Sequence, residues 1–350
     1  MAPFRPDVVH AKKRDHEETP PDLESVSFTS EYVALAVKRR STSRIHVRRH
    51  DAAMYGVAES DLLVLTEEDG LDGEPRVSLR PSARGGASRA GPACLAYVLK
   101  RERVVVRSLP SGEVLVDLGP FTGGPGGGCF SNWSPDGALL AIGGLFGAHI
   151  YRLEAVDATA TSFVLLMSFA DATPSTWLYT LAFDPGSQLI ATCGQSQRVI
   201  VRRVSKTAHD TVHEQHRFQH DCVTSCTVFT PSSSRIVYGA DRDLGAELFV
   251  RDVDTGSILA NFKCGDWGGP CAFVPSSEQQ LLFHKGALVD IEAGTEEPWS
   301  PLLCAEGAKC LDFVEIDSHV RVLGIKNTSA YEKVGLGGMP SLVLYDMKRL

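Results

Sequence analysis

Short apolar runs recur along the chain, and each one follows an apolar or aromatic residue and a tight-turn signal. Five copies of this signal consist of that anchor residue, one further residue, a proline and small turn residues; they are Leu79-Arg-Pro81, Trp133-Ser-Pro135, Phe183-Asp-Pro185, Phe229-Thr-Pro231 and Phe273-Val-Pro275. Two further anchors, Phe28 and Phe313, hold the same place without a proline. Proline fixes φ and the small residues after it reverse the chain, so we expect each anchor to end an inner strand.

The anchors stand 40 to 54 residues apart, close to the roughly 40–50 residues of a four-stranded propeller blade. Each turn is followed by an apolar run, as in YVALAV, CLAYVL, ALLAIGG, QLIATCG, RIVYGA, QLLFHKG and VRVLGI. Runs of this kind are typical of strands covered on both faces. A third strand is predicted after each, in RIHVRR, RVVVRS, HIYRL, VIVRRV, ELFVRDV, ALVDI and LVLYDM.

These patterns predict an all-β fold: a single seven-bladed β-propeller of four-stranded antiparallel blades that occupies residues 1–350. The blades are expected at residues 24–66, 74–119, 127–170, 177–218, 222–263, 269–304 and 308–350. Residues 61–69 (DLLVLTEED) fit either a fourth strand or an insertion, so the strand register is least defined over residues 55–95. The last blade lacks a fourth strand, and we expect residues 4–10 to pair outside Leu342–Met347 and close the ring.

From Trp133 onward the chain resembles WD-repeat proteins, in the segments WSPDGALLAIGG and LFVRDVDTG. The resemblance implies a structural hydrogen bond from His220, nine residues before Phe229, to Asp241 or Asp243 in the loop between the second and third strands. The tryptophan of the Trp-Asp pair is replaced in every blade, by Arg48, Arg107, Tyr151, Arg202, Arg251, Val289 and Tyr345. The four arginines suggest either an anion-binding ring or aliphatic stems packed on the sheets, and we favour the second.

Charge and composition narrow the function. The formal net charge of −8 argues against general nucleic-acid binding. The apolar runs are far shorter than the roughly 20 residues that cross a bilayer, and the charged start of the chain lacks the apolar segment of a secretory signal. We therefore expect a cytoplasmic protein, with the nucleus as the alternative, whose nine cysteines form no disulfides.

Candidate chemistry is sparse. His209, His213, His216 and His220 suggest a metal site, but a strand would turn the first two and the last two to opposite faces. The glycine-rich stretch at residues 123–129 lacks the Lys-Ser/Thr of a phosphate loop. We therefore expect no enzyme activity, metal or cofactor; the alternative is an enzyme or a small-ligand or metal-binding propeller that uses the central channel.

Basic residues gather where the predicted fold brings loops of the first and last blades together. They are Lys12, Lys13, Arg14, Lys38, Arg39, Arg40, Arg44, Lys326 and Lys333. Such a patch on an acidic chain would attract an acidic or phosphorylated protein, although charge runs often serve only solubility. We expect a non-catalytic protein-interaction scaffold that is a subunit of a complex and binds its partner through this face.

Overall fold

Every regular element in the described part of the chain is a β-strand, which confirms the predicted all-β class. The computed structural model describes residues 22–29, 31–39, 42–49, 63–66, 76–81, 92–99, 103–121, 129–145, 147–155, 161–169, 176–204, 213–242, 245–264, 271–273, 277–283, 287–298, 309–316, 319–326 and 341–347. Over these ranges we find no helix with the length and apolar character needed to span a membrane.

The described strands form seven antiparallel sheets, of which six have four strands and one has three. The first three sheets are β1 (Asp22–Phe28), β2 (Tyr32–Arg39), β3 (Thr42–Arg49) and β4 (Leu63–Leu65); β5 (Val77–Leu79), β6 (Ala93–Leu99), β7 (Arg103–Leu109) and β8 (Val114–Leu118); and β9 (Phe130–Trp133), β10 (Leu139–Gly144), β11 (Gly147–Ala155) and β12 (Thr161–Phe169). In each sheet the strands lie side by side in chain order.

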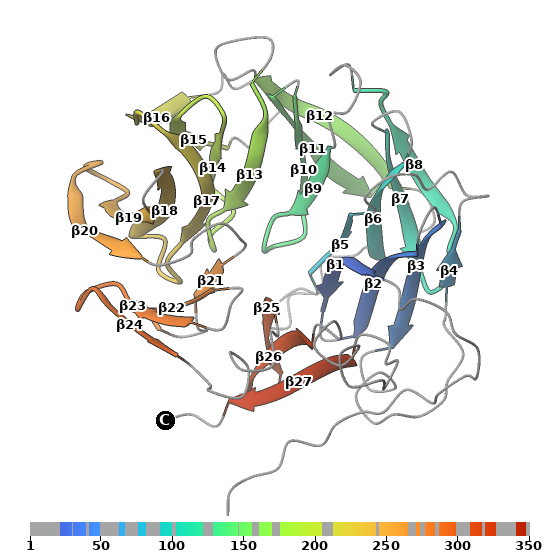
Figure 1. Ribbon diagram of the computed structural model, residues 1–350. Coiled ribbons are helices and arrows are strands. Elements are labelled where there is room, and N and C mark those ends of the chain that lie inside the picture. Colours follow the sequence, from blue (N-terminus) through green and yellow to red (C-terminus); the bar gives the residue numbers. More distant parts are fainter. Residues whose placement is uncertain are drawn as a thin grey trace, which may run out of the picture.

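The same order continues in the rest of the chain (Figure 1). These sheets are β13 (Leu178–Phe183), β14 (Leu189–Gly194), β15 (Arg198–Arg203) and β16 (His213–Gln219); β17 (Val223–Phe229), β18 (Arg235–Arg242), β19 (Gly245–Asp252) and β20 (Ile258–Cys264); β21 (Cys271–Phe273), β22 (Gln280–Phe283), β23 (Ala287–Asp290) and β24 (Thr295–Pro298); and β25 (Lys309–Ile316), β26 (His319–Lys326) and β27 (Ser341–Met347).

The first strand of each sheet contacts the first strand of the next, from β1 through β5, β9, β13, β17 and β21 to β25. The strand β25 also contacts β1. The contacts between sheets therefore run through the whole described chain and return to its first sheet. The closed seven-bladed propeller stays a prediction, and residues 4–10, predicted to close it, lie outside the described residues.

The predicted second and third strands are confirmed in all seven sheets, with ends that shift by a few residues. Six anchors end a first strand as predicted, but Phe313 does not: β25 continues to Ile316, which pairs with His319. Without a proline after the anchor the ladder is free to continue, as it does past Phe313, although β1 still ends at Phe28. Residues 61–69, left open between strand and insertion, contain β4 at Leu63–Leu65.

The core of the protein lies between the sheets. The apolar side chains of β6 show this, because Leu95 and Tyr97 pack toward the first sheet whereas Cys94 and Ala96 pack toward the third. Successive residues of a strand point to opposite faces, so one strand contributes to two layers of core. All six residues of β10 and all six of β14 are buried, as the continuous apolar runs predicted.

The turn after an anchor has the same hydrogen bonds in three sheets. The residue next to the anchor is Ser134, Asp184 or Thr230, each fully or almost fully buried. Its backbone carbonyl accepts the N–H of the residue three positions later, at 2.8–2.9 Å. Its side chain accepts the N–H of the first residue of the next strand, which is Leu139, Leu189 or Arg235. A side-chain acceptor therefore satisfies a backbone donor that the turn leaves inside the protein.

Neighbouring turns are also joined to one another. Ser187 and Ser233 have left-handed backbones with φ of 55° and 64°, a conformation that side chains other than glycine adopt at some cost. Their hydroxyls explain why serine stands there: Ser187 Oγ accepts the N–H of Asp136 in the preceding turn, and Ser233 Oγ donates to Asp184 Oδ2 at 2.9 Å. These bonds link the third, fourth and fifth sheets along one edge.

We expect Asp184→Ala to lower the free energy of unfolding by about 2–4 kcal/mol, because hydrogen bonds to a charged acceptor are the strong ones. The carboxylate accepts the backbone N–H groups of Gly186, Gln188 and Leu189 and the hydroxyl of Ser233. Urea unfolding measures the loss. Asp254→Ala, which removes an exposed carboxylate in a hairpin turn, is the control and should cost less than about 0.5 kcal/mol. Equal losses for the two variants would contradict this account of the turn.

Candidate functional site

The structure describes only part of the predicted basic patch. Lys38 and Arg39 are the last residues of β2, where they pair with Ser43 and Thr42 of β3, and the side chain of Arg44 on β3 is exposed. Lys326 is the last residue of β26. The remaining predicted residues, Lys12, Lys13, Arg14, Arg40 and Lys333, lie outside the described residues. The hairpin of β2 and β3 thus gathers three of the cations, and β1 and β25 place its sheet beside that of Lys326.

Arginines at the position of the missing tryptophan make a repeated structural contact. Arg251 Nε donates to Tyr238 Oη at 2.7 Å, and its Nη1 donates to the carbonyl of Gly256 at 2.7 Å. Arg107 makes the equivalent bonds, at 2.8 Å each, to Tyr97 and Gly112. Both glycines have a left-handed backbone, with φ of 71° and 74°, which turns the carbonyl of the hairpin toward the guanidinium. The two sheets therefore share one Arg–Tyr–Gly contact.

Arginines at this position also join adjacent sheets. The guanidinium of Arg202 lies 4.0 Å from the ring centre of Phe169 on β12 of the preceding sheet, and Arg251 lies 4.2 Å from that of Phe218 on β16. Arg202 is only 4% exposed and donates to Thr192 Oγ1 at 3.0 Å. Desolvated cation–π contacts contribute on the order of 2 kcal/mol. These contacts favour the structural interpretation of the arginines over an anion-binding ring.

His220 belongs to the same network. Its Nε2 lies 3.1 Å from Tyr238 Oη, and its ring packs against that of Phe249 with centroids 4.8 Å apart. Arginine only donates hydrogen bonds, so Tyr238 Oη accepts from Arg251 and lies within hydrogen-bond distance of His220 Nε2 as well. His220, Tyr238 and Arg251 therefore form one connected set of polar contacts within the fifth sheet.

One of the two acidic residues predicted to bind His220 lies in a strand and not in the predicted loop, and the predicted bond itself stays a prediction. Asp241 belongs to β18, where it pairs with Val223 and Ala246, and is not part of a loop. The pairing of β18 with β19 continues as far as Arg242 and Gly245, so Asp241 is part of the strand. Asp243 lies outside the described residues. In the described structure the bond from His220 Nε2 is made with the tyrosine hydroxyl.

The other histidines of the predicted cluster are separated by the strand. His213 is exposed at the start of β16, whereas His216 is half-buried, with Nε2 2.7 Å from the carbonyl of Val253. His209 lies outside the described residues. No three His, Cys, Asp or Glu side chains in the described part of the chain are grouped closely enough to hold a metal ion.

Five of the cysteines in the described ranges are free thiols. Cys94, Cys129, Cys193 and Cys226 are buried and Cys222 is half-buried. Burial raises the pKa of the Cys94 thiol to about 11, against smaller opposing effects of Arg80. Because the thiolate is the reactive form, a raised pKa makes Cys94 a packing residue rather than a nucleophile.

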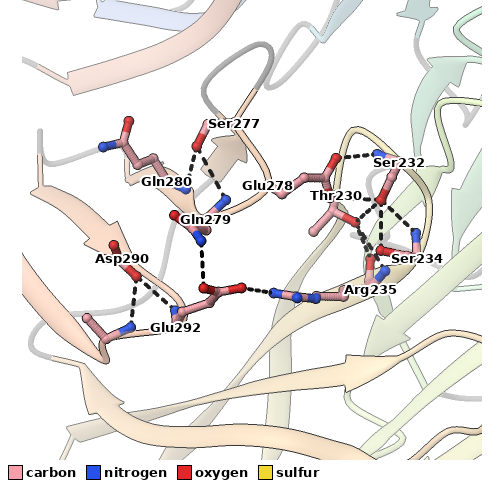
Figure 2. Close-up of polar contacts among 11 residues, drawn as sticks. Thr230, Ser232, Ser234, Arg235, Ser277, Glu278, Gln279, Gln280, Asp290 and Glu292 are labelled. Atoms are coloured by element: carbon pink, nitrogen blue, oxygen red, sulfur yellow. Dashed lines mark hydrogen bonds and ion pairs between the residues drawn. The ribbon is translucent and has the colours of Figure 1, made fainter. Parts of the chain in front are cut away.

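Contacts between the fifth and sixth sheets were not predicted from the sequence, and Figure 2 shows them. Both carboxylate oxygens of Glu278 accept from Ser232, from its N–H at 2.7 Å and its hydroxyl at 2.8 Å. Glu292 accepts from Arg235 at 2.9 Å and from Gln279 at 2.6 Å. The only sequence signal is that polar residues follow two successive anchors. These contacts continue the series of bonds between turns.

Comparison with models of known families and with curated proteins finds no match for this chain.

We expect the alkaline loss of stability to depend on Tyr238. Burial raises the pKa of this phenol from 10.0 to about 12, against smaller opposing effects of Arg251. A group whose pKa is raised by folding stabilises the folded state fully below the unfolded pKa, and that contribution is lost as the pH rises through the folded pKa. The free energy of unfolding should therefore fall between pH 10 and 12.

The comparison to make is urea unfolding of the wild type and of Tyr238→Phe across this range. The phenylalanine variant is less stable below pH 10 because Arg251 loses its hydroxyl partner, and its stability should fall less steeply above that pH. The thiol of Cys94 contributes to the fall in both proteins, so the difference between the two profiles is the diagnostic quantity. Parallel profiles would show that the buried phenol is not a cause.

Proposed function

We propose that the chain is a seven-bladed β-propeller of the WD-repeat kind that acts as a non-catalytic protein-interaction scaffold. In this proposal it is a cytoplasmic subunit of a complex. The face formed by the loops of the first and last blades binds an acidic or phosphorylated protein segment.

The order of contacts between sheets supports the propeller. Seven sheets with strands in chain order pack first strand against first strand, and β25 contacts both β21 and β1. Five described clusters of buried apolar residues each lie between two consecutive sheets. A radial arrangement satisfies this packing because every sheet then has a neighbour on both faces. The recurrence of one turn and one arginine contact in several sheets supports a repeat of one structural unit.

The position of the basic hairpin carries the proposed function. Lys38 and Arg39 end β2, Arg44 lies near the start of β3, and Lys326 ends the corresponding strand of the neighbouring sheet. In a propeller the loops between second and third strands share one face, so these cations and the loop residues near them would form one patch. Clustered cations on a chain of net charge −8 accelerate association with acidic partners.

Deletion of residues 1–10 tests the closed propeller. The sheet of β25, β26 and β27 has three described strands, and the proposal assigns residues 4–10 to the free edge of β27. Removal of that strand should lower the melting temperature by several degrees, since each lost kilocalorie shifts it by about 2–4 °C in a chain of this size. The control shuffles residues 4–10 with unchanged composition and should behave like the deletion. An unchanged melting temperature in both variants would rule out the closing strand.

Charge reversal tests the proposed face. The triple variant Lys38→Glu, Arg39→Glu and Arg40→Glu should no longer bind proteins that proximity labelling and pull-down find with the wild type. Its association with these proteins at low salt should be slower by about tenfold or more. Arg203→Glu with Lys263→Glu is the control, because it reverses exposed cations on β15 and β20 and should retain the partners. Equal retention by both variants would reject the basic face but not the scaffold.

Thermal shift separates this proposal from the alternative of a small-ligand or metal-binding channel. A specific ligand of the folded state raises the melting temperature in proportion to its affinity and concentration. A clear rise with one metal ion or one metabolite from a panel would favour the alternative.

A further inference from the structure

Tyr179 is an exposed aromatic side chain in an unexpected place, because it lies on a first strand. It is 41% exposed and belongs to β13, which packs between β9 and β17 of the neighbouring sheets (Figure 1). The other large apolar side chains that are exposed in the described ranges all lie on outer strands; they are Val64, Val114, Leu165, Ile258 and Leu259. The position of its strand therefore does not explain the exposure of Tyr179.

A β-bulge accounts for this exposure. The register shifts between Leu178 and Thr180, so that Tyr179 is the extra residue. A bulge interrupts the ladder and redirects the side chain of the extra residue. The same shift occurs in β1 and β17, where Glu24 and Ser225 hold that place. The repeat therefore favours a bulge at the start of a first strand but does not require a tyrosine in it.

A second aromatic side chain, Trp177, lies two positions before Tyr179 and is half-buried. Leu178 between them is 3% exposed, as expected of an extended segment whose alternate side chains point to opposite sides. In the described structure neither the indole N–H of Trp177 nor the hydroxyl of Tyr179 has a hydrogen-bond partner. Tryptophan and tyrosine with an apolar ring and an available polar tip are typical of the residues that dominate protein interfaces.

The turn between β14 and β15 holds the backbone of Trp177 in place. The carbonyl of Trp177 accepts the N–H of Gln195 at 2.9 Å, and its N–H donates to Gln195 Oε1 at 3.3 Å. A Cβ atom on Gly194 would lie 2.0 Å from that carbonyl oxygen, so only glycine permits this approach. A partner that binds the two rings therefore loses little affinity to ordering of this backbone.

Arg198, the first residue of β15, supplies a positive charge beside this turn. Its Nε donates to Gln219 Oε1 at 2.7 Å, and it forms no ion pair with a described carboxylate. Since β15 lies two strands from β13, ordinary strand spacing places Arg198 about 10 Å from Leu178. The exposed Asp221 contributes a negative charge, and its carbonyl accepts from Gln197 of the same turn. A carboxylate of a partner is therefore favoured near Arg198 and disfavoured near Asp221.

We propose that Trp177 and Tyr179 bind an apolar side chain of an acidic partner segment, and that a carboxylate next to that side chain pairs with Arg198. This inference rests on the proposed scaffold function. The turn between β14 and β15 joins a second strand to a third, as the basic hairpin of β2 and β3 does, and in the proposed propeller such turns share one face. The two sites belong to different sheets, so a segment that reaches both gains affinity from each.

Selection from a random peptide library displayed on phage, with the full chain as bait, tests this site. The selected peptides are synthesised, and fluorescence polarisation measures their dissociation constants. We expect peptides that combine an aromatic, leucine or proline residue with aspartate or glutamate. Tyr179→Ser should raise their dissociation constants by about tenfold or more, whereas Tyr179→Phe should retain most of the affinity because the ring remains. Ile258→Ser, which removes an exposed apolar side chain of an outer strand, is the control and should bind like the wild type.

Two charge variants test the placement of the carboxylate. Arg198→Gln should weaken the binding of the same peptides, and Asp221→Asn should not, because the two changes have opposite effects on the local charge. Equal melting temperatures exclude unfolding as the cause of any loss. The proposal would be overturned if no selected peptide depended on Tyr179, or if Tyr179→Ser and Ile258→Ser weakened binding equally.

The triple variant Lys38→Glu, Arg39→Glu and Arg40→Glu separates this site from the basic face. Peptides that lose affinity with Tyr179→Ser but not with the triple variant would support the aromatic site and count against the basic face. The reverse result would retain the basic face and reject the aromatic site.

Discussion

Each sheet of this protein depends on its neighbours to bury both of its faces. The second strands show this most directly, since alternate residues of β6, β10, β14 and β18 belong to different layers of core. A four-stranded sheet with two apolar faces is not stable in water alone, because it has no second layer of its own. The repeat, the spacing of the anchors and the order of contacts between sheets all follow from this requirement.

Apolar packing does not by itself fix the position of one sheet against the next, because flat apolar faces tolerate small displacements. Directional bonds at two places fix that position. At one edge, the hydroxyls of Ser187 and Ser233 connect successive turns. Farther out, Arg202 and Arg251 reach from the third strand of their own sheet to an aromatic ring of the sheet before it. Arginine thus serves here as a large planar side chain that also donates hydrogen bonds.

The elements of the fold were predictable from sequence because their signals are local. A continuous apolar run such as LLAIGG specifies a strand buried on both faces, and proline after an anchor specifies a turn. Of the two anchors without that proline, Phe28 ends its strand as predicted, whereas at Phe313 the predicted strand end was wrong. The candidate site was much less predictable: a basic cluster was visible in the sequence, but Tyr238 as the neighbour of both Arg251 and His220 was not. That contact joins residues 13 and 18 positions apart, and only the pairing of strands brings them together.

The same logic separates the surfaces that are free to evolve a function from those that are not. The faces of the sheets are buried against neighbouring sheets, and the arginines and turn residues form the bonds between those sheets. What remains are the loops that connect the strands of a hairpin and the outer edges of sheets. The hairpin of β2 and β3 carries unusual charge among the first. Interaction with other chains is therefore expected at the two kinds of place where the repeat places no demand on the side chains.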